Sequence, residues 1–274
     1  MAKKIFVFSR YTKRFINYIL LIIMSRFLKN TDITEIVKKF VIKTIMERSL
    51  IVPKDRILIA VSGGKDSSLL AWTLSAIRPA LKFDYTLSAL HISTDFCACC
   101  KKNELSNRLN DWEIPFTDLF VPVIGRLKDN KKMNCYWCST QRRMELIKYA
   151  VENNFNKIAL GHHLDDIIET FFMNLFQKGT LLTMPISLKY RKFPIDLIRP
   201  LALLEEKQII ECAAKLNILK NVCTCPYGQN SNRRSIRHKI ADFVSNEKKD
   251  SSGDIKRRIL KALGEGQIDF LTEK

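Results

Sequence analysis

The sequence predicts an α/β fold in which approximately five parallel strands form one sheet with helices on both faces. Apolar runs of strand length occur at 57–61, 85–92, 116–123 and 157–160, and a polar-patterned stretch of helix length separates each run from the next. Strands that alternate with helices in this way form parallel sheets, because each helix carries the chain back across one face. A length of 274 residues suffices for one large domain with its own core.

Residues 1–30 precede this pattern as a basic and apolar N-terminal extension. They hold seven Lys or Arg residues and no acid around an apolar run at 15–23. This run is too short to cross a bilayer as a helix, so we expect no transmembrane segment. The extension is a surface-lying anchor, a basic arm for RNA, or an over-long start with Met24 as the true initiator.

The main domain is expected over 31–245. Its first helix follows Asp32, where apolar residues recur at helical spacing as far as Ile45. The segment 178–200 contains three prolines and predicts an irregular connection or a hairpin. Residues 246–274 are expected to form a charged C-terminal tail with one short helix at 255–263.

The charge balance favours a polyanionic partner. A net charge of +18 and a pI near 9.6 attract nucleic acid first and a membrane surface second. Eight cysteines are too few for a disulfide-dense scaffold, and no signal peptide with a cleavage site is evident. We therefore expect reduced thiols and a cytoplasmic location.

The most specific motif follows the first predicted strand. The string Ser-Gly-Gly-Lys-Asp-Ser at 62–67 lies between this strand and an apolar helix that opens at Ser68. Gly63 and Gly64 let the backbone approach an anion, which also faces free N–H groups and the positive end of the helix. Asp66 occupies the place of the Ser or Thr of a Walker A loop, so kinase or GTPase chemistry is disfavoured. The other donors to the anion are Ser62, Ser67, Ser68 and Lys65.

A second motif, Gly161-His162-His163-Leu164-Asp165-Asp166, follows the fourth predicted strand. Ligands of open parallel sheets bind at the carboxyl ends of the strands. Two adjacent carboxylates beside two imidazoles suit Mg²⁺ binding near a polyphosphate. The alternative is a helix N-terminus whose acids complement the dipole, but the glycine loop favours the first interpretation.

The cysteine spacing predicts a metal centre. Cys135 and Cys138 precede a predicted helix that contains Arg142 and Arg143. The two cysteines supply two ligands for tetrahedral zinc or for an iron–sulfur cluster, and one later cysteine completes three. Spacing alone does not distinguish Cys223 from Cys225 as that third ligand. Three thiolates leave one cluster iron open to carry sulfide, whereas zinc and inert thiols are the alternatives.

Four other cysteines have no predicted role in this centre. Cys97, Cys99 and Cys100 bind a second metal, carry persulfide sulfur or are reduced thiols, of which we favour the last. Cys212 lies on a helical pattern and is expected in the core.

Together these strings resemble the tRNA 2-thiocytidine synthetases (tRNA-cytidine 2-sulfurtransferases), a family of the PP-loop N-type ATP pyrophosphatase superfamily. The resemblance covers about 33–240 and implies a Rossmann-like, HUP-like architecture for the domain. The strings that carry it are 62–67, Cys135 with Cys138, 142–143, 161–166, 198–201 and Cys225.

In that family, ATP activates the C2 carbonyl oxygen of a cytidine in the anticodon loop, and sulfide held on a 4Fe–4S cluster displaces AMP. The resemblance therefore implies ATP, Mg²⁺ and a 4Fe–4S cluster as cofactors and tRNA as substrate. A cysteine desulfurase or other donor would supply the sulfur, and a homodimer is compatible with the family.

The resemblance also implies a role for each matching residue. The catalytic candidates are Lys65, Asp66, Asp165, Cys135 and Cys138. The nucleotide-binding candidates are Ser62, Gly63, Gly64, Lys65, Asp66, Ser67, Gly161, His162 and Asp166. The cluster ligands are Cys135, Cys138 and Cys225, with Cys223 as the alternative. The RNA contacts are Arg142, Arg143, Arg233, Arg234 and Arg237.

Other classes share some of these features. A tRNA 2-thiouridine synthetase has the same cluster logic but usually adds further zinc-binding motifs. A tRNA lysidine synthetase has both nucleotide motifs but no need for the cysteines. A zinc-dependent deaminase is excluded because its His-x-Glu and Pro-Cys-x-x-Cys motifs are lacking. A non-enzymatic RNA- or metal-binding module leaves the glycine loop unexplained.

Overall fold

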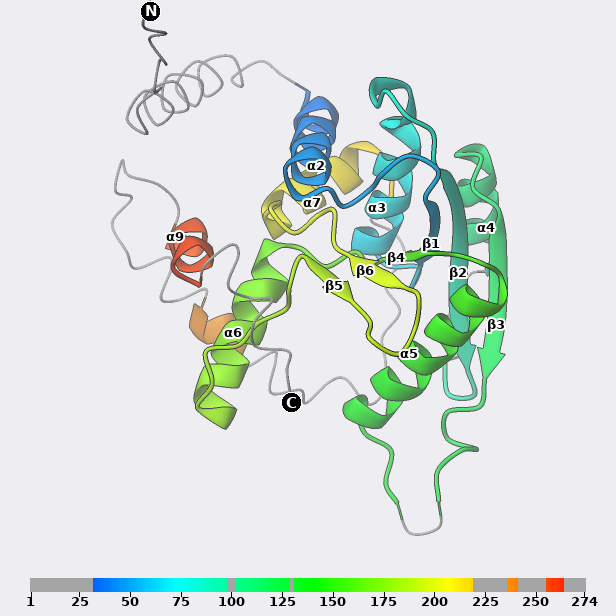
Figure 1. Cartoon of the computed structure of the whole chain (residues 1–274). Coiled ribbons are helices and arrows are strands. Elements are labelled where there is room, and N and C mark those ends of the chain that lie inside the picture. Colours follow the sequence, from blue (N-terminus) through cyan, green and yellow to red (C-terminus); the bar gives the residue numbers. More distant parts are fainter. Residues whose placement is uncertain (1–31, 98–101, 129–130, 219–235, 241–254, 264–274) are drawn as a thin grey trace, which may run out of the picture.

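The protein is described here from a computed structural model over residues 32–97, 102–128, 131–218, 236–240 and 255–263 (Figure 1). The N-terminal extension and most of the C-terminal tail lie outside these residues. No helix within the described part of the chain is long and apolar enough to cross a membrane.

A six-stranded sheet forms the centre of the fold, with strand order β3-β2-β1-β4-β6-β5. The predicted α/β class is therefore confirmed, with one strand more than the approximate count. All neighbouring strands pair in parallel except β5 and β6, which are antiparallel. The strands are β1 (Arg56–Ala60), β2 (Thr86–Thr94), β3 (Phe116–Val121), β4 (Lys157–Ala159), β5 (Ser187–Lys189) and β6 (Asp196–Ile198).

The antiparallel pair of β5 and β6 lies inside the proline-containing segment 178–200. This segment therefore forms the hairpin, one of the two alternatives predicted for it. Leu188 pairs with Leu197 in this hairpin, and Leu197 also pairs with Ile158 of β4. The hairpin therefore joins the parallel sheet through β6. Each of its two strands has only three residues, which is too short for an alternating pattern to reveal it in the sequence.

Helices cover both faces of the sheet, as Figure 1 shows. They are α2 (Ile33–Arg48), α3 (Lys65–Ala76), α4 (Lys102–Asp111), α5 (Cys135–Glu152), α6 (Leu164–Lys178), α7 (Glu206–Lys215) and α9 (Ile255–Ala262), with a 3₁₀ turn η2 (Arg78–Ala80). The side chains of β1 alternate between two cores. Ile57 and Ile59 pack with residues of α2, α3, α4, α6, α7 and α9, whereas Leu58 packs with residues of α5.

Two helices begin earlier than the sequence pattern predicts. The helix after the glycine loop begins at Lys65 instead of Ser68, because Gly64 takes the N-cap position. The helix after the Cys-x-x-Cys string begins at Cys135, because the side chain of Asn134 accepts a hydrogen bond from the Trp137 N–H at 2.8 Å. In both cases the first turn carries polar or reactive residues that lack the apolar spacing of a helix.

Leu58 tests the packing of the sheet against α5. Its side chain is fully buried, so we expect Leu58→Ala to lower the free energy of unfolding by about 2–5 kcal/mol. Leu181→Ala is the control, because Leu181 is 66% exposed and its truncation should change that free energy by less than about 0.5 kcal/mol. Equal effects of the two substitutions in urea denaturation would contradict the packing described here.

Candidate active site

The glycine loop connects the carboxyl end of β1 to the first turn of α3. Gly63 has a φ of +80°, a left-handed conformation that L side chains rarely adopt. The Ser67 hydroxyl holds the loop closed, because it accepts from the Ser62 N–H and donates to the Gly64 carbonyl, both at 3.1 Å. Gly64 caps α3 without a side-chain hydrogen bond. The positive end of α3 is therefore left available to an anion.

Gly161 brings the second motif into contact with this loop. It follows β4, which pairs in parallel with β1. A Cβ atom on Gly161 would lie 2.9 Å from the Ser67 nitrogen and 3.0 Å from the Asp66 carbonyl oxygen. Only a glycine fits this approach, so the backbones of the two motifs lie directly against each other.

A pocket of about 390 Å³ lies where the two motifs meet α5. This volume is within the usual range for small-molecule sites. Its walls include motif residues predicted to bind nucleotide, together with four residues of α5. The motif residues are Ser62, Asp66, Ser67, Gly161, His162 and Asp166. The α5 residues are Ser139, Arg142, Arg143 and Leu146.

The charge of this pocket suits an anionic ligand that carries a cation. The two arginines of α5 and the helix N-terminus of α3 attract negative charge. Asp66 and Asp166 add carboxylates to the same pocket, and oxygen ligands suit Mg²⁺. The pocket therefore combines the groups that a metal–polyphosphate complex requires.

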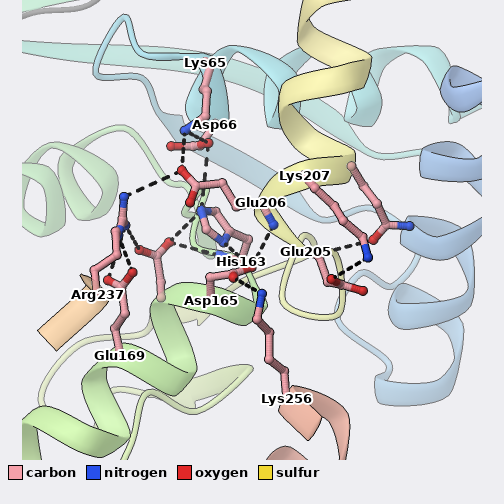
Figure 2. Close-up of polar contacts among 12 residues, drawn as sticks. Lys65, Asp66, His163, Asp165, Glu169, Glu205, Glu206, Lys207, Arg237 and Lys256 are labelled. Atoms are coloured by element: carbon pink, nitrogen blue, oxygen red, sulfur yellow. Dashed lines mark hydrogen bonds and ion pairs between the residues drawn. The ribbon is translucent and has the colours of Figure 1, made fainter. Parts of the chain in front are cut away.

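The two adjacent aspartates of the second motif face different surroundings. Asp166 lines the pocket and accepts from the His163 N–H at 3.2 Å. Asp165 accepts instead from the Glu206 N–H at 2.7 Å and forms an ion pair with Lys256 of α9 (Figure 2). Asp165 thus connects α6 to α7 and α9 and is not among the pocket residues.

His163 shares its surroundings with these carboxylates. It is almost fully buried, with ring nitrogens 3.4 Å from Asp166, 3.6 Å from Asp165 and 4.0 Å from Asp66. Burial by itself lowers the pKa of His163, but the carboxylates outweigh it and raise the pKa above its ordinary value. Burial alone would raise the pKa of Asp165, but its interaction with the His163 ring and hydrogen bonds from Lys256 and the Glu206 N–H hold it well below its ordinary value.

An ion network beside the pocket was not predicted from the sequence (Figure 2). Lys65 lies 3.0 Å from Asp66 and 3.1 Å from Glu206, and its side chain is not among the pocket residues. Arg237 pairs through two nitrogens with Glu169, a carboxylate that is almost fully buried. No sequence pattern marks Glu206 of α7 as a member of this network. Glu169 lies one turn after Asp165 and extends the acidic face of α6.

The five predicted RNA contacts are only partly described. Arg142 and Arg143 line the pocket. Arg237 forms ion pairs with Glu169 and Glu206. Its contact with RNA stays a prediction. Arg233 and Arg234 lie outside the described residues.

The cysteine pair occupies the first turn of α5, next to the pocket. Cys135 is exposed and Cys138 is half-buried. Cys138 directly precedes Ser139 of the pocket wall. Two thiols at this spacing on one helical turn fit two ligands of a metal centre.

The third ligand remains a prediction, because Cys223 and Cys225 lie outside the described residues, as do Cys99 and Cys100. Among the residues that the structure places, no group of three His, Cys, Asp or Glu side chains could hold a metal ion. Cys97 follows β2 and is half-buried. Cys212 is fully buried, which confirms its place in the core, and burial raises its pKa to about 11.

Comparison with known proteins identifies relatives of the chain. The model of a family described as PP-loop domain matches residues 30–243. A tRNA-cytidine(32) 2-sulfurtransferase of Coxiella burnetii is 31% identical over 77% of this chain and 83% of its own length. A tRNA-cytidine(32) 2-sulfurtransferase of Francisella tularensis subsp. tularensis is 35% identical over 62% of this chain, and the match spans only 64% of that relative.

Two solved structures share the fold. The U34-tRNA thiolase NcsA from Methanococcus maripaludis, with its [4Fe-4S] cluster, has a TM-score of 0.67 at 24% identity and is matched over 84% of this chain and 77% of its own. The NMN synthetase from Francisella tularensis has a TM-score of 0.53 at 16% identity, over 85% and 93% of the two chains. These two likenesses bear on the fold alone.

The contact at Gly161 predicts an asymmetry between two glycines. We expect Gly161→Ala to lower the free energy of unfolding by about 1–3 kcal/mol, because the new Cβ overlaps backbone atoms that cannot rotate away. In Gly64→Ala the nearest atom is the Ser62 hydroxyl at 3.5 Å, which is an ordinary contact. Thermal and urea unfolding of both variants measure the difference, and a smaller effect at Gly161 than at Gly64 would contradict the close approach.

The low pKa of Asp165 predicts a loss of stability in acid. A carboxylate whose pKa is depressed in the folded state stabilises the protein above its unfolded pKa, here near 3.8, and this contribution is lost progressively as the pH falls from that value to the lower folded pKa. Lys256→Met removes one of its partners, so we expect the free energy of unfolding to fall less between about pH 4 and pH 2 than in the unmodified protein. Parallel pH dependences for the two proteins would show that the ion pair does not contribute.

Proposed function

The chain belongs to the PP-loop domain family, and from this premise we propose that it is an ATP-dependent tRNA sulfurtransferase that converts a cytidine of the anticodon loop to 2-thiocytidine. One observation carries the proposal. A single pocket joins the glycine loop, the second motif and the helix that begins with the cysteine pair. ATP, the target base and the incoming sulfur can meet there.

ATP would bind with its phosphates against the amino end of α3. The backbone N–H groups of the loop and the hydroxyls of Ser62 and Ser67 would donate to the phosphate oxygens. Asp166 lines the same pocket and is the better placed of the two adjacent aspartates to bind Mg²⁺. Asp165 would instead support the site from behind, through α7 and α9.

The tRNA would approach along α5. Arg142 and Arg143 would contact its phosphates, with Arg233, Arg234 and Arg237 as further predicted contacts. The net charge of +18 supports such an encounter, because a basic surface concentrates and steers a polyanion.

The reaction proposed for this pocket has two steps. The C2 carbonyl oxygen of cytidine attacks the α-phosphorus of ATP, forms an O–P bond and releases pyrophosphate. An incoming sulfide then forms the C–S bond at C2 as the C–O bond breaks, so that AMP leaves with the original oxygen. The arginines and the α3 N-terminus would stabilise the negative charge that develops in both steps.

Cys135 and Cys138 would hold two corners of the cluster, and Cys225, or Cys223 in its place, the third. When bound, the 4Fe–4S cluster would supply the sulfide. Cys135 lies one helical turn before Ser139, and Cys138 lies one turn before Arg142. Both thiols are therefore close to where the base would lie. A cysteine desulfurase or other donor would supply the sulfur in the cytoplasm, and the proposal allows a homodimer.

Anaerobic purification tests the metal centre directly. We expect iron and acid-labile sulfide in near-stoichiometric amounts, and their loss in Cys135→Ala and Cys225→Ala, because each variant removes one ligand. Cys212→Ala is the matched control, since this thiol lies in the core of α7, and it should keep the iron. Zinc in place of iron, or iron that survives both ligand substitutions, would overturn the cluster assignment.

Thionucleoside analysis tests the activity. tRNA incubated with the iron-loaded protein, ATP and a sulfide source should gain 2-thiocytidine with equimolar AMP and pyrophosphate, and Asp166→Asn should lower the rate by at least about tenfold. Formation of 2-thiouridine instead would assign the chain to the thiouridine class. Absence of any thionucleoside would refute the proposed function.

A further inference from the structure

Arg199 is a buried cation next to the pocket, and it has no role in the two steps of the proposed reaction. It follows β6 directly and is 6% exposed. Its Nη1 group donates to the Pro185 carbonyl, and its Nε–H donates to Nδ1 of His162 at 3.3 Å. Burial lowers its pKa to about 10, which leaves the guanidinium charged at neutral pH.

The sheet register places these two residues together. β6 pairs in parallel with β4, so that Ile198 lies beside Ala159, and the Leu160 N–H donates to the Ile198 carbonyl at 3.0 Å. Both strands end at this point. The chain then continues into His162 on one side and Arg199 on the other, which makes their contact a consequence of strand pairing.

The contact specifies which nitrogen of His162 carries a proton. A guanidinium has donors only, so Nδ1 must present its lone pair to the Arg199 Nε–H. A proton on Nδ1 would set two N–H groups against each other, and an imidazolium would add a second positive charge beside a buried one. The neutral ring therefore carries its proton on Nε2.

Other charged groups near His162 include both signs. Arg142 and Arg143 lie on the α5 wall of the pocket, and Asp166 lies on the α6 wall. Adjacent His163 contrasts with it, because three carboxylates surround that ring and favour its protonated form. Two neighbouring imidazoles are thus directed toward opposite protonation states by what lies next to them.

We propose that Arg199 is a positioning residue that holds His162 as the neutral Nε2–H tautomer, so that His162 donates a hydrogen bond to the nucleotide and does not act as a base. The role as donor to the nucleotide rests on the proposed function, whereas the tautomer does not. A neutral donor stabilises negative charge on a phosphate oxygen without taking a proton from the reacting base.

Nitrogen NMR of the full-length protein measures the tautomer without any substrate. The chain has four histidines, so ¹⁵N-labelled histidine gives few signals, and His162→Gln assigns those of His162. At pH 7 we expect Nδ1 to have the shift of an unprotonated nitrogen and Nε2 that of a protonated one. A cationic ring, or a proton on Nδ1, would overturn the proposal whether or not the protein thiolates tRNA.

Substitution of Arg199 tests the cause of this state. Arg199→Lys keeps the positive charge but loses the planar Nε–H donor, so we expect the His162 signals to move toward a mixture of tautomers. Thermal unfolding would establish that the variant folds. Signals identical to those of the unmodified protein in a folded Arg199→Lys variant would show that Arg199 does not fix the ring.

ATP binding by His162 variants separates a donor from a base. Glutamine can accept from Arg199 through its amide oxygen and donate through its amide nitrogen, so ATP affinity should fall less in His162→Gln than in His162→Leu. His162→Leu should lose about tenfold in affinity, the value of one hydrogen bond. Equal, large losses of kcat in both variants would indicate a base and refute the donor role. If the unmodified protein itself bound no ATP, the proposed function and the donor role would fail, and the NMR result would still decide the tautomer.

Discussion

The close approach of two backbones at Gly161 is the constraint on which the rest of the site depends. β1 and β4 lie side by side, and their carboxyl ends turn into the two motifs. Because nothing larger than a hydrogen fits between Gly161 and the first turn of α3, the two loops form one wall. The Ser67 hydroxyl then closes the glycine loop from within. A ligand thus meets a preformed surface, whose polar groups need little reorganisation when it binds.

Charge is divided between the two sides of this wall. On the pocket side, two carboxylates, Asp66 and Asp166, share the lining with arginines of α5. On the far side, carboxylates of α6 and α7 are neutralised by Lys65, Arg237 and Lys256, which come from three separate parts of the chain (Figure 2). Such pairs hold the segments in place, since removal of one partner leaves a buried charge. The far-side network therefore links residues 236–240 and α9 to the motif that enters the pocket.

The sequence predicted the layers and the meeting of the motifs, because both follow from local patterns. Buried strands appear as apolar runs, and glycine turns between a strand and a helix are specific. The sequence predicted the hairpin of β5 and β6 only as one of two alternatives for 178–200, because these strands are too short to show a period. It could not separate Asp165 from Asp166, because the direction of each side chain depends on α7 and α9, which lie far along the chain. Contacts between residues that are far apart in the sequence leave no local pattern from which they could be predicted.

Helix α5 carries both the cysteine pair and the two arginines of the pocket. Cys138 and Arg142 lie on consecutive turns of α5, separated by about 6 Å of helical rise. A helix is stiff over this distance, so the spacing between the thiol pair and the guanidinium group is fixed. Under the proposed function, this helix and not the surrounding loops sets the distance between sulfur delivery and the arginine that would bind phosphate.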